Sequence, residues 1–415
     1  MSEYTREEIL KMIEEVGGPQ NLDLSGQDLS GIDLSKEAIA KELEKYRQNN
    51  PDQTPLWFSD ETEGIDLHGA ILKKANLSEA HLEGVFLWEA HLEGAFLGEA
   101  HLGGAVLGWA RLEGADLGWA HLEGAHLGWA HLERAFLRLA HLEGAFLGWA
   151  HLEEAHLWQA HLEGADLLGA HLKGAMLREA NLKEAILRGA HLEKVDLYDV
   201  ANLAGAYFYG VFLDQTRMKR EQLGDRIGED IHKEYYQAKE AYLLLKNNFN
   251  QIGRYDDASW AYVKERQMEK MTHHPKLAHI YYAKIERLPE GTSPKSWTWW
   301  RFYVKYTLKW LWDWIIELLC GYGERPGRVL GAMLVVLILA PFAYSLLGGL
   351  SHTNGRAATA LDYLVYSFDA FTRIVGTDLL PLTMWGHLVT GLEAFLAILL
   401  ASLFVYTLGR RISRS

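Results

Sequence analysis

The sequence predicts a mixed fold: a β-helical solenoid, then an α-helical linker, then a membrane part with two helices. The first observation is that every fifth residue from Leu67 to Leu197 is leucine, usually with alanine two places earlier. The second is that this repeat stops after Leu213, where helical periodicity replaces it. The third is a pair of long apolar segments near the C-terminus.

A period of five residues fits neither an α-helix nor a single strand. On a helix, successive leucines would be about 140° apart and would spread around the circumference. On one strand, an odd period would place them on opposite faces. If each five-residue unit instead forms one side of a coil, alanine and leucine both point inward. The sequence therefore predicts a solenoid with an alanine and leucine core.

These units resemble pentapeptide repeats, whose pattern is Ala-(Asp/Asn)-Leu-x-x. Ala75-Asn76-Leu77 and Ala115-Asp116-Leu117 match it, and many other units carry histidine in the second place. The resemblance implies a right-handed quadrilateral β-helix with four repeats per coil. It would span residues 21–213, with an inserted helix and loop at about 36–64.

The N-terminal segment, residues 1–20, contains the capping-box pair Thr5 and Glu8 and is predicted to be a short helix. Solenoid ends expose unpaired strand edges, so this helix is expected to cover the first coil. The alternative is a frayed tail.

Residues 214–296 show helical periodicity and are similar to one tetratricopeptide unit. The segment is either a helical linker that caps the solenoid or a peptide-binding module. Pro289 and the Gly-Thr-Ser-Pro stretch at 291–294 predict a hinge.

Residues 297–320 form a tryptophan-rich segment with a polar stripe. The stripe residues recur at spacings of four, which places them on one helix face: Arg301, Lys305, Lys309, Asp313 and Glu317. Indole rings and cationic side chains favour the headgroup level of a membrane. The segment is therefore predicted to be an interfacial helix, and a buried soluble helix is the alternative.

Composition excludes several function classes. The formal net charge of −14 argues against a general nucleic-acid binder. The single cysteine, Cys320, excludes an intramolecular disulfide. We find no nucleophile–base pair and no phosphate-binding loop, so the sequence predicts no enzyme, no cofactor and no resident metal. An acidic rod that mimics DNA, as in some pentapeptide-repeat proteins, is an alternative that the membrane spans disfavour.

Residues 321–415 are predicted to be a membrane domain. The first predicted span, at about 329–350, carries no charge, and the second, at about 388–408, carries one charge, Glu393. Each is long enough to cross a hydrocarbon core of about 30 Å. Arginines flank the outer ends of both spans, so by the positive-inside rule both termini are cytoplasmic. The sequence thus predicts a multi-pass protein of the cell (inner) membrane, in contact with lipid.

The connection at 361–381, a short apolar segment followed by a glycine-containing loop, has a re-entrant layout. This domain resembles the pore domain of two-transmembrane potassium channels at Thr372, Asp378, Pro381, Gly386 and Glu393. The resemblance implies a homotetramer that conducts an inorganic cation, with Pro381 and Glu393 as supporting residues. The filter residues would be Thr372, Arg373, Ile374, Val375, Gly376, Thr377 and Asp378.

The filter departs from the family pattern Thr-x-Gly-Tyr-Gly-Asp. Val375, Gly376 and Thr377 stand where the family has Gly, Tyr and Gly, so a glycine is missing. Arg373 disfavours a standard cation site, and we do not expect potassium selectivity. Glu393 is either a functional acid inside the bundle or a structural acid bonded to the back of the pore helix.

If a coil has twenty residues, positions twenty apart stack. One histidine column contains His81, His101, His121, His141 and His161, with Glu123, Glu143 and Glu163 beside it. A second, opposite column contains His131, His151, His171 and His191. The columns could titrate together or bind a transition metal. Alternatively, duplication copied a solvated face without a function.

Trp109, Trp129 and Trp149 form a further column, next to Val106, His126 and Phe146. Exposed apolar columns mark contact surfaces, here for subunit or domain packing or for a small ligand. The leading hypothesis is a cation-channel-like tetramer with a cytoplasmic solenoid as a regulatory or assembly domain. The alternative is a non-conducting, membrane-anchored scaffold that binds protein partners.

Overall fold

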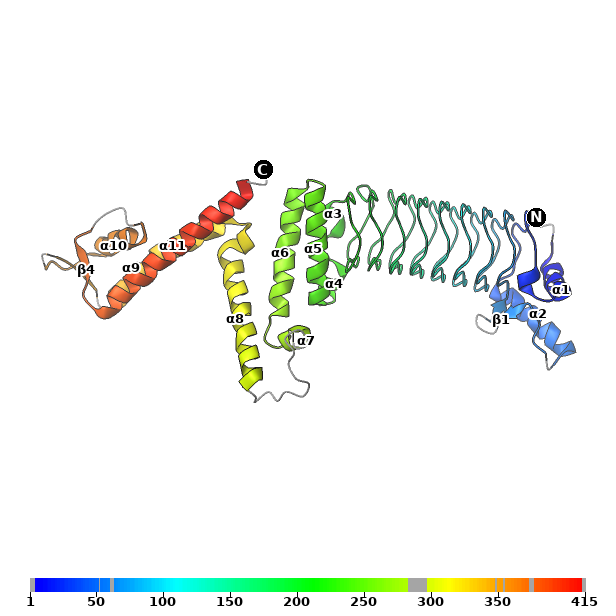
Figure 1. Ribbon diagram of the computed structural model, residues 1–415, viewed down its shortest axis with the longest axis horizontal. Helices are drawn as coiled ribbons and strands as arrows, with labels where there is room; N and C mark the ends of the chain where they lie inside the picture. Colours follow the sequence, from blue (N-terminus) through cyan, green and yellow to red (C-terminus); the bar gives the residue numbers. More distant parts are fainter. Residues whose placement is uncertain are drawn as a thin grey trace. The chain divides into compact units, whose positions relative to one another are not determined.

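The computed structural model describes residues 4–51, 53–59, 63–282, 297–347, 349–353, 355–372 and 377–412. The chain divides into two compact units, Met1–Met268 and Glu269–Ser415 (Figure 1). The first unit contains the solenoid with its end caps, and the second contains the apolar helices. The predicted hinge around residues 289–294 lies outside the described residues.

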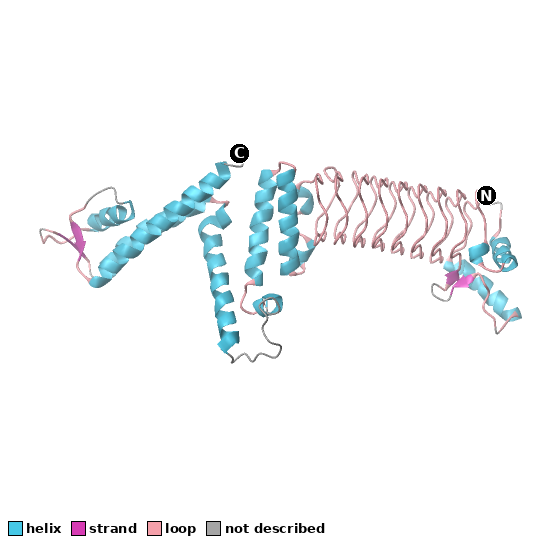
Figure 2. Ribbon diagram, viewed as in Figure 1, coloured by secondary structure: helices cyan, strands magenta, loops and turns pink. Residues whose placement is uncertain are grey.

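The solenoid is a coil of parallel bridges with a register of 20 residues, such as His131 to His151 and His151 to His171. Each coil bonds to both neighbours. The amide of His151 donates to the Ala130 carbonyl of the previous coil (2.9 Å), and the amide of Leu152 donates to the His171 carbonyl of the next coil (2.8 Å). Figure 2 colours this stretch as loop because each side contributes an isolated bridge rather than a long strand.

A tight turn closes every five-residue unit. The Ala130 amide donates to the Leu127 carbonyl at 3.1 Å, and Trp129 between them has a φ of +56°. The equivalent corner at Gly124 has a φ of +63°. Glycine tolerates this left-handed conformation without steric cost, which explains why glycine so often follows the leucines.

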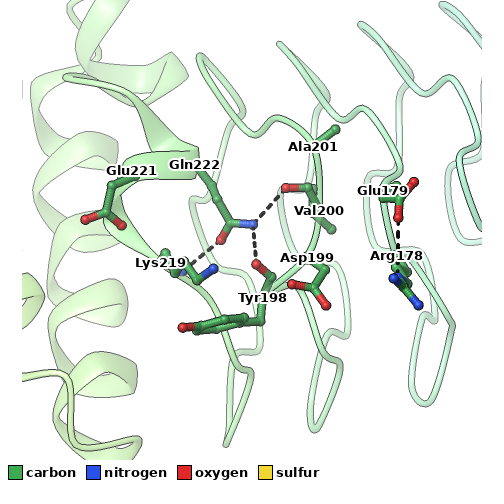
Figure 3. A pocket seen from close by; sticks show the side chains of 9 residues that line it. All are labelled: Arg178, Glu179, Tyr198, Asp199, Val200, Ala201, Lys219, Glu221 and Gln222. Carbon is green, nitrogen blue, oxygen red and sulfur yellow. Dashed lines mark hydrogen bonds and ion pairs between the residues drawn. The ribbon is translucent and has the colours of Figure 1, made fainter.

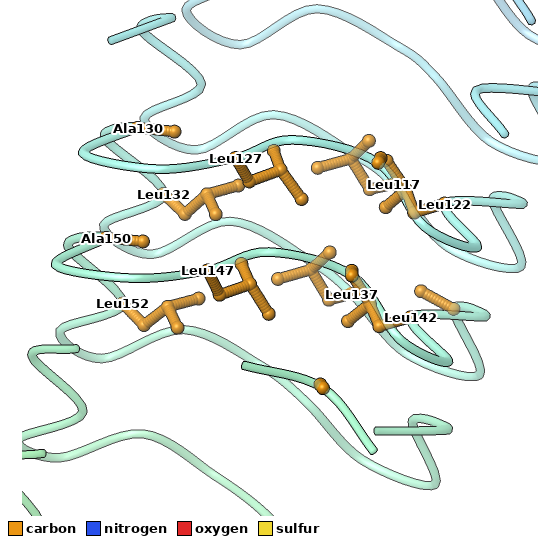
Figure 4. Close-up of a cluster of buried hydrophobic side chains, with 14 of the residues drawn as sticks. Leu117, Leu122, Leu127, Ala130, Leu132, Leu137, Leu142, Leu147, Ala150 and Leu152 are labelled. Carbon is orange, nitrogen blue, oxygen red and sulfur yellow. The ribbon is translucent and has the colours of Figure 1, made fainter. Parts of the chain in front are cut away.

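Alanine and leucine fill the interior, as the pattern predicts. Leucines of successive coils lie one above another, such as Leu127 above Leu147 and Leu132 above Leu152 (Figure 4). Each of these four side chains is 1% exposed. Full burial of one leucine contributes about 1.5–3 kcal/mol, so this stack is the main source of the solenoid's stability.

An insertion interrupts the first coil. Asp23 pairs with Ile71 and Asp33 pairs with His81, in a register that skips the intervening segment. That segment contains α2 (Lys36–Asn49) and an antiparallel pair of short strands, β1 (Phe58–Ser59) and β2 (Gly64–Ile65).

The N-terminal helix α1 (Arg6–Val16) begins at the capping box of Thr5 and Glu8, and η1 (Pro19–Asn21) follows it. Ile9 and Ile13 are almost completely buried, and Ile9 lines the same small apolar space as the first core leucines. Val16, the last apolar residue of this helix, does not lie on its buried face. It is 41% exposed because the helix ends there, at Gly17.

The ladder of parallel bridges that forms the solenoid continues past the predicted end at residue 213. Asp196 pairs with Arg217, in a register of 21 residues that reflects the slip in the leucine frame. Thr216 and Met218 are both fully buried, in the places that alanine and leucine occupy elsewhere. The pattern did not reveal this last unit because neither residue matches the repeat.

Four helices follow, and three of them cover the final coil. They are α3 (Arg220–Leu223), α4 (Gly228–Ile231), α5 (Tyr235–Gln251) and α6 (Tyr255–Thr272). The Gly228 amide donates to the Ala206 carbonyl at 2.8 Å, and the Asn248 side chain of α5 donates to the Thr216 carbonyl at 2.8 Å. These bonds satisfy edge groups that would otherwise be open to another chain.

The second unit contains α7 (Ala278–Tyr282), α8 (Trp297–Cys320), η2 (Gly321–Gly323), α9 (Pro326–Leu346), β3 (Leu350–His352), α10 (Ala360–Thr372), β4 (Leu379–Pro381) and α11 (Met384–Ile412). By length and composition, α9 and α11 can cross a membrane; their mean hydropathy is 2.3 in each case. Only 22% and 17% of the two segments are buried within the chain, unlike the core helix of a soluble domain.

The predicted limits of both spans need correction. The first helix ends at Leu346 rather than at 350, because Gly349 (φ +77°) turns the chain into β3, which pairs antiparallel with β4. The second helix is longer than the predicted 388–408, since it begins at Met384 directly after β4.

The polar stripe on α8 does not face solvent or headgroups throughout. Asp313 is 5% exposed, and its carboxylate lies 2.8 Å from Nδ1 of His273. Glu317 forms an ion pair with Lys270 at the end of α6. The acidic half of the stripe is therefore a packing contact, because its partners come from a segment about forty residues earlier in the chain.

Candidate functional site

The apolar helices are joined by one buried carboxylate. Glu393 of α11 is 2% exposed. It accepts a hydrogen bond from the Tyr344 hydroxyl of α9 (2.6 Å) and another from the Ser367 hydroxyl of α10. A single side chain thus ties the short helix α10 to both long helices.

Further contacts hold α10 in the same place. The Tyr366 ring packs edge-on against Tyr344 with centroids 5.2 Å apart, and its hydroxyl lies 3.2 Å from Thr390 Oγ1 of α11. A Cβ on Gly386 would come within 2.8 Å of Pro381. The close approach of β4 to the start of α11 therefore requires glycine at this position.

The predicted filter is only partly visible. Thr372 ends α10, and its hydroxyl donates to the Phe368 carbonyl at 2.7 Å. Thr377 Oγ1 lies 3.5 Å from the Asp369 carboxylate. Four of the seven predicted filter residues, Arg373, Ile374, Val375 and Gly376, lie outside the described residues.

Asp378, at the end of the predicted filter, has a partner that the sequence analysis did not identify. Its carboxylate lies 3.1 Å from Nδ1 of His352 in β3, and Nε2 of the same ring lies 3.4 Å from Asp362. The hydrogen bond to Asp378 is the main reason why the pKa of His352 is raised above its ordinary value. This pair connects the two strands that flank α10.

The histidine columns are stacked rings. Along the first column, from His81 to His161, ring centroids lie 4.6–4.9 Å apart with nearly parallel planes. The second column, from His131 to His191, has the same spacing, 4.7–4.9 Å. The coil-to-coil hydrogen bonds fix this spacing, because each histidine occupies a bridge position.

Glutamates accompany both columns, not only the first. His131 Nδ1 lies 3.1 Å from Glu133 Oε1, and His151 Nδ1 lies 3.6 Å from Glu153 Oε1. The glutamates predicted beside the first column are therefore only part of the set. The repeated tripeptide His-Leu-Glu carries the missing signal, since residues two apart point to the same side of an extended chain.

The tryptophan column is also stacked. The rings of Trp109 and Trp129 are 5.8 Å apart, those of Trp129 and Trp149 are 5.0 Å apart, and all three are more than 40% exposed. On the adjacent face, the ring of His126 stacks on that of Phe146 at 4.6 Å. All three tryptophans occupy left-handed corners, with φ of 55–57°, where bulky residues are rare.

A hollow of about 530 Å³ lies where the leucine frame slips (Figure 3). The Gln222 side chain donates to the carbonyls of Leu197 (2.6 Å) and Val200 (2.9 Å), which closes the irregular coil. Arg178, Asp199 and Lys219 also line it, so its charges are of both signs. The hollow follows from the slip and has no evident chemistry of its own.

Comparison with protein families identifies the solenoid. Residues 63–220 match the pentapeptide-repeat family in eight copies, over 63–88, 82–118, 90–128, 120–159, 159–197 and 177–220. The predicted pentapeptide repeats are therefore confirmed, and this segment is a pentapeptide-repeat domain. The matched residues end at 220, before the apolar helices.

Several solved structures are similar to the chain. HetL, a pentapeptide repeat protein involved in heterocyst differentiation regulation in the cyanobacterium Nostoc sp. strain PCC 7120, is 26% identical, with 52% of this chain and 94% of HetL covered and a TM-score of 0.22. A pentapeptide repeat protein from the thylakoid lumen of Arabidopsis thaliana is 33% identical. The similarity covers 24% of this chain and 68% of the Arabidopsis protein, with a TM-score of 0.23.

QnrB1, a plasmid-mediated fluoroquinolone resistance protein, is 18% identical. The similarity covers 48% of this chain and 81% of QnrB1, with a TM-score of 0.22. A search of curated proteins gave no match.

Proposed function

We propose that the protein is a cation-channel-like membrane protein that assembles as a homotetramer. Its pentapeptide-repeat solenoid, with the right-handed coil of that family, would lie in the cytosol as a regulatory or assembly domain. The observation that carries this proposal is Glu393, which holds the short helix α10 against α9 and α11. A short helix fixed between two long apolar helices is the layout of a re-entrant pore loop.

The energetics of a bilayer support this interpretation. A short helix and an irregular loop are tolerated at membrane depth only where they are buried in protein or line water. In one copy of the chain, most of α9 and α11 remains exposed, for example Leu334 (59%) and Phe395 (63%). Lipid and neighbouring copies would cover these faces. One loop per chain cannot enclose a conduit, so several copies must surround it.

The orientation rests on charge. The short connection between the spans contains few cationic residues, whereas arginines flank the outer ends of both helices. By the positive-inside rule, both termini and the solenoid face the cytoplasm of the cell. Asp378 would then lie on the opposite side, at the outer mouth, where its 59% exposed side chain could attract cations.

Ion flux through the purified full chain in liposomes tests this proposal. We expect cation flux that Asp378→Asn reduces, because the substitution removes one negative charge per subunit from the mouth. Asp225→Asn, in the segment that follows the solenoid, is the matched control and should leave flux unchanged. An ion series would then determine selectivity. Absence of flux from protein shown to be tetrameric would contradict the channel proposal.

A second candidate is a membrane-anchored scaffold that does not conduct and binds protein partners through the solenoid. The stacked and exposed tryptophans Trp109, Trp129 and Trp149 favour it, since such a column is a ready contact surface. A tetramer without flux, combined with partner binding that Trp129→Ala weakens, would support the scaffold instead.

A further inference from the structure

We infer that the two histidine columns of the solenoid bind divalent transition-metal ions, each ion held between consecutive coils by a His–Glu–His triple. Four such triples occur among the described residues: His81–Glu83–His101, His141–Glu143–His161, His131–Glu133–His151 and His151–Glu153–His171. In each triple, the three candidate ligand atoms lie within 4.8 Å of one another. This inference does not depend on the proposed channel.

The distances fit a tetrahedral ion after small side-chain movements. Glu153 Oε1 lies 3.6 Å from Nδ1 of His151 and 3.7 Å from Nδ1 of His171, so it sits almost midway between the two rings. Zinc bonds of about 2.0–2.1 Å require ligand atoms about 3.3–3.5 Å apart. The carboxylate therefore needs to move by a few tenths of an ångström, and the two stacked rings must tilt towards each other.

The glutamates lack a partner for one oxygen. Oε2 of Glu83, Glu133, Glu143 and Glu153 is buried and has no hydrogen-bond partner among the described residues. A buried carboxylate oxygen without a partner is costly. A cation bound at the other oxygen would offset this cost, because it neutralises the charge of the whole carboxylate.

One coil already places a cation in the equivalent position. Arg111 occupies a place that histidine holds elsewhere in the second column. Its guanidinium lies 3.1 Å from Glu93 and 3.4 Å from Glu113, which belong to consecutive coils. The column of carboxylates therefore accommodates a positive group that joins two coils, as the inferred metal ion would.

The ligand set indicates the class of ion. Two imidazoles and one carboxylate suit Zn²⁺, Co²⁺ or Ni²⁺, whereas Mg²⁺ prefers oxygen ligands alone. The histidine side chains of the triples are between 34% exposed, for His151, and 48% exposed, for His81, so solvent can supply a fourth ligand. Because His151 belongs to two triples, at most three of the four can be filled at once.

Zinc titration of the full chain in detergent, without an affinity tag, tests this inference. We expect calorimetry to give up to three Zn²⁺ per chain, because the four triples share one histidine. Binding should be lost in His101→Asn/His141→Asn/His151→Asn, which removes a ligand from every triple. Asparagine already stands at this position at Asn76 and Asn181, so the variant is expected to fold.

The matched control is His126→Asn/His156→Asn. These histidines occupy the same place in the repeat but are followed by Gly128 and Trp158 instead of glutamate. This variant should bind zinc like the unsubstituted chain. Replacement of the four glutamates by glutamine, with all histidines kept, should weaken binding at least tenfold.

Thermal unfolding gives a second readout. Zinc should raise the melting temperature of the unsubstituted chain and of the control, since an ion that bridges coils stabilises the folded state. It should not raise that of the triple histidine variant, which must melt like the others in the absence of zinc. Equal binding by the triple variant and the control, unaltered binding by the glutamine variant, or no binding at all would each overturn the inference.

Discussion

The solenoid and the apolar helices bury leucine to opposite extents. Leu132 in the solenoid is 1% exposed, whereas Leu392 on α11 is 60% exposed. In the solenoid, neighbouring coils supply both the apolar contacts and the backbone hydrogen-bond partners, so one chain satisfies itself. In α9 and α11, the backbone is satisfied within each helix, but many apolar side chains remain exposed within the chain. The two regions therefore depend on different surroundings.

The largest effect should come from the solenoid core. Leu132→Ala leaves a cavity between two coils and should lower the free energy of unfolding by about 2–5 kcal/mol. The same truncation at Leu392 should change stability in detergent by less than about 0.5 kcal/mol, because the side chain is exposed within the chain. Denaturant unfolding monitored by circular dichroism measures both. Similar losses at the two positions would remove the contrast between the regions.

A second test concerns Glu393, the buried acid that joins α9, α10 and α11. Glu393→Ala leaves the hydroxyls of Tyr344 and Ser367 without their acceptor and should lower the free energy of unfolding of the helical part by about 2 kcal/mol. Glu393→Gln keeps a carbonyl oxygen and should cost less. Unfolding in increasing fractions of a denaturing detergent measures this, while the solenoid signal should stay constant. A stable alanine variant would show that the three helices pack without the acid.

A smaller effect is expected at the tryptophan corners. Trp129 has a φ of +56°, so Trp129→Gly should be more stable than Trp129→Ala by about 1 kcal/mol. Trp158 is not among the described residues with positive φ and is the matched control. There the glycine variant should gain no advantage over the alanine variant. Chemical denaturation of the four variants compares them, and an equal difference at both corners would contradict the strain argument.

The smallest effect is local and depends on pH. The raised pKa of His352 means that its pairs with Asp378 and Asp362 contribute fully below the ordinary histidine pKa of 6.5. That contribution is lost as the pH rises through the higher pKa of the folded state. Amides of β3 and β4 should therefore be better protected from hydrogen exchange at acidic than at alkaline pH, after correction for intrinsic rates. His352→Ala should abolish the difference; if the difference persists, another group is responsible.

The sequence alone determined the solenoid. Alanine and leucine two residues apart must face the same way, so a period of five fixes which side chains point inward and which form columns. The stacks of His81 to His161 and of Trp109 to Trp149 follow from the same arithmetic once the coil length is twenty. A strictly local pattern was sufficient because each coil contacts only its neighbours.

Other features depended on partners that are distant in sequence. Thr216 and Met218 extend the ladder of parallel bridges because their buried side chains fill the alanine and leucine positions of the last coil. Asp313 becomes a buried partner because His273 happens to lie against α8. The acceptor role of Glu393 likewise requires Tyr344, 49 residues earlier. No local period encodes such pairings, so the tertiary structure alone decided which polar groups meet, while the repeat had already decided how the core is packed.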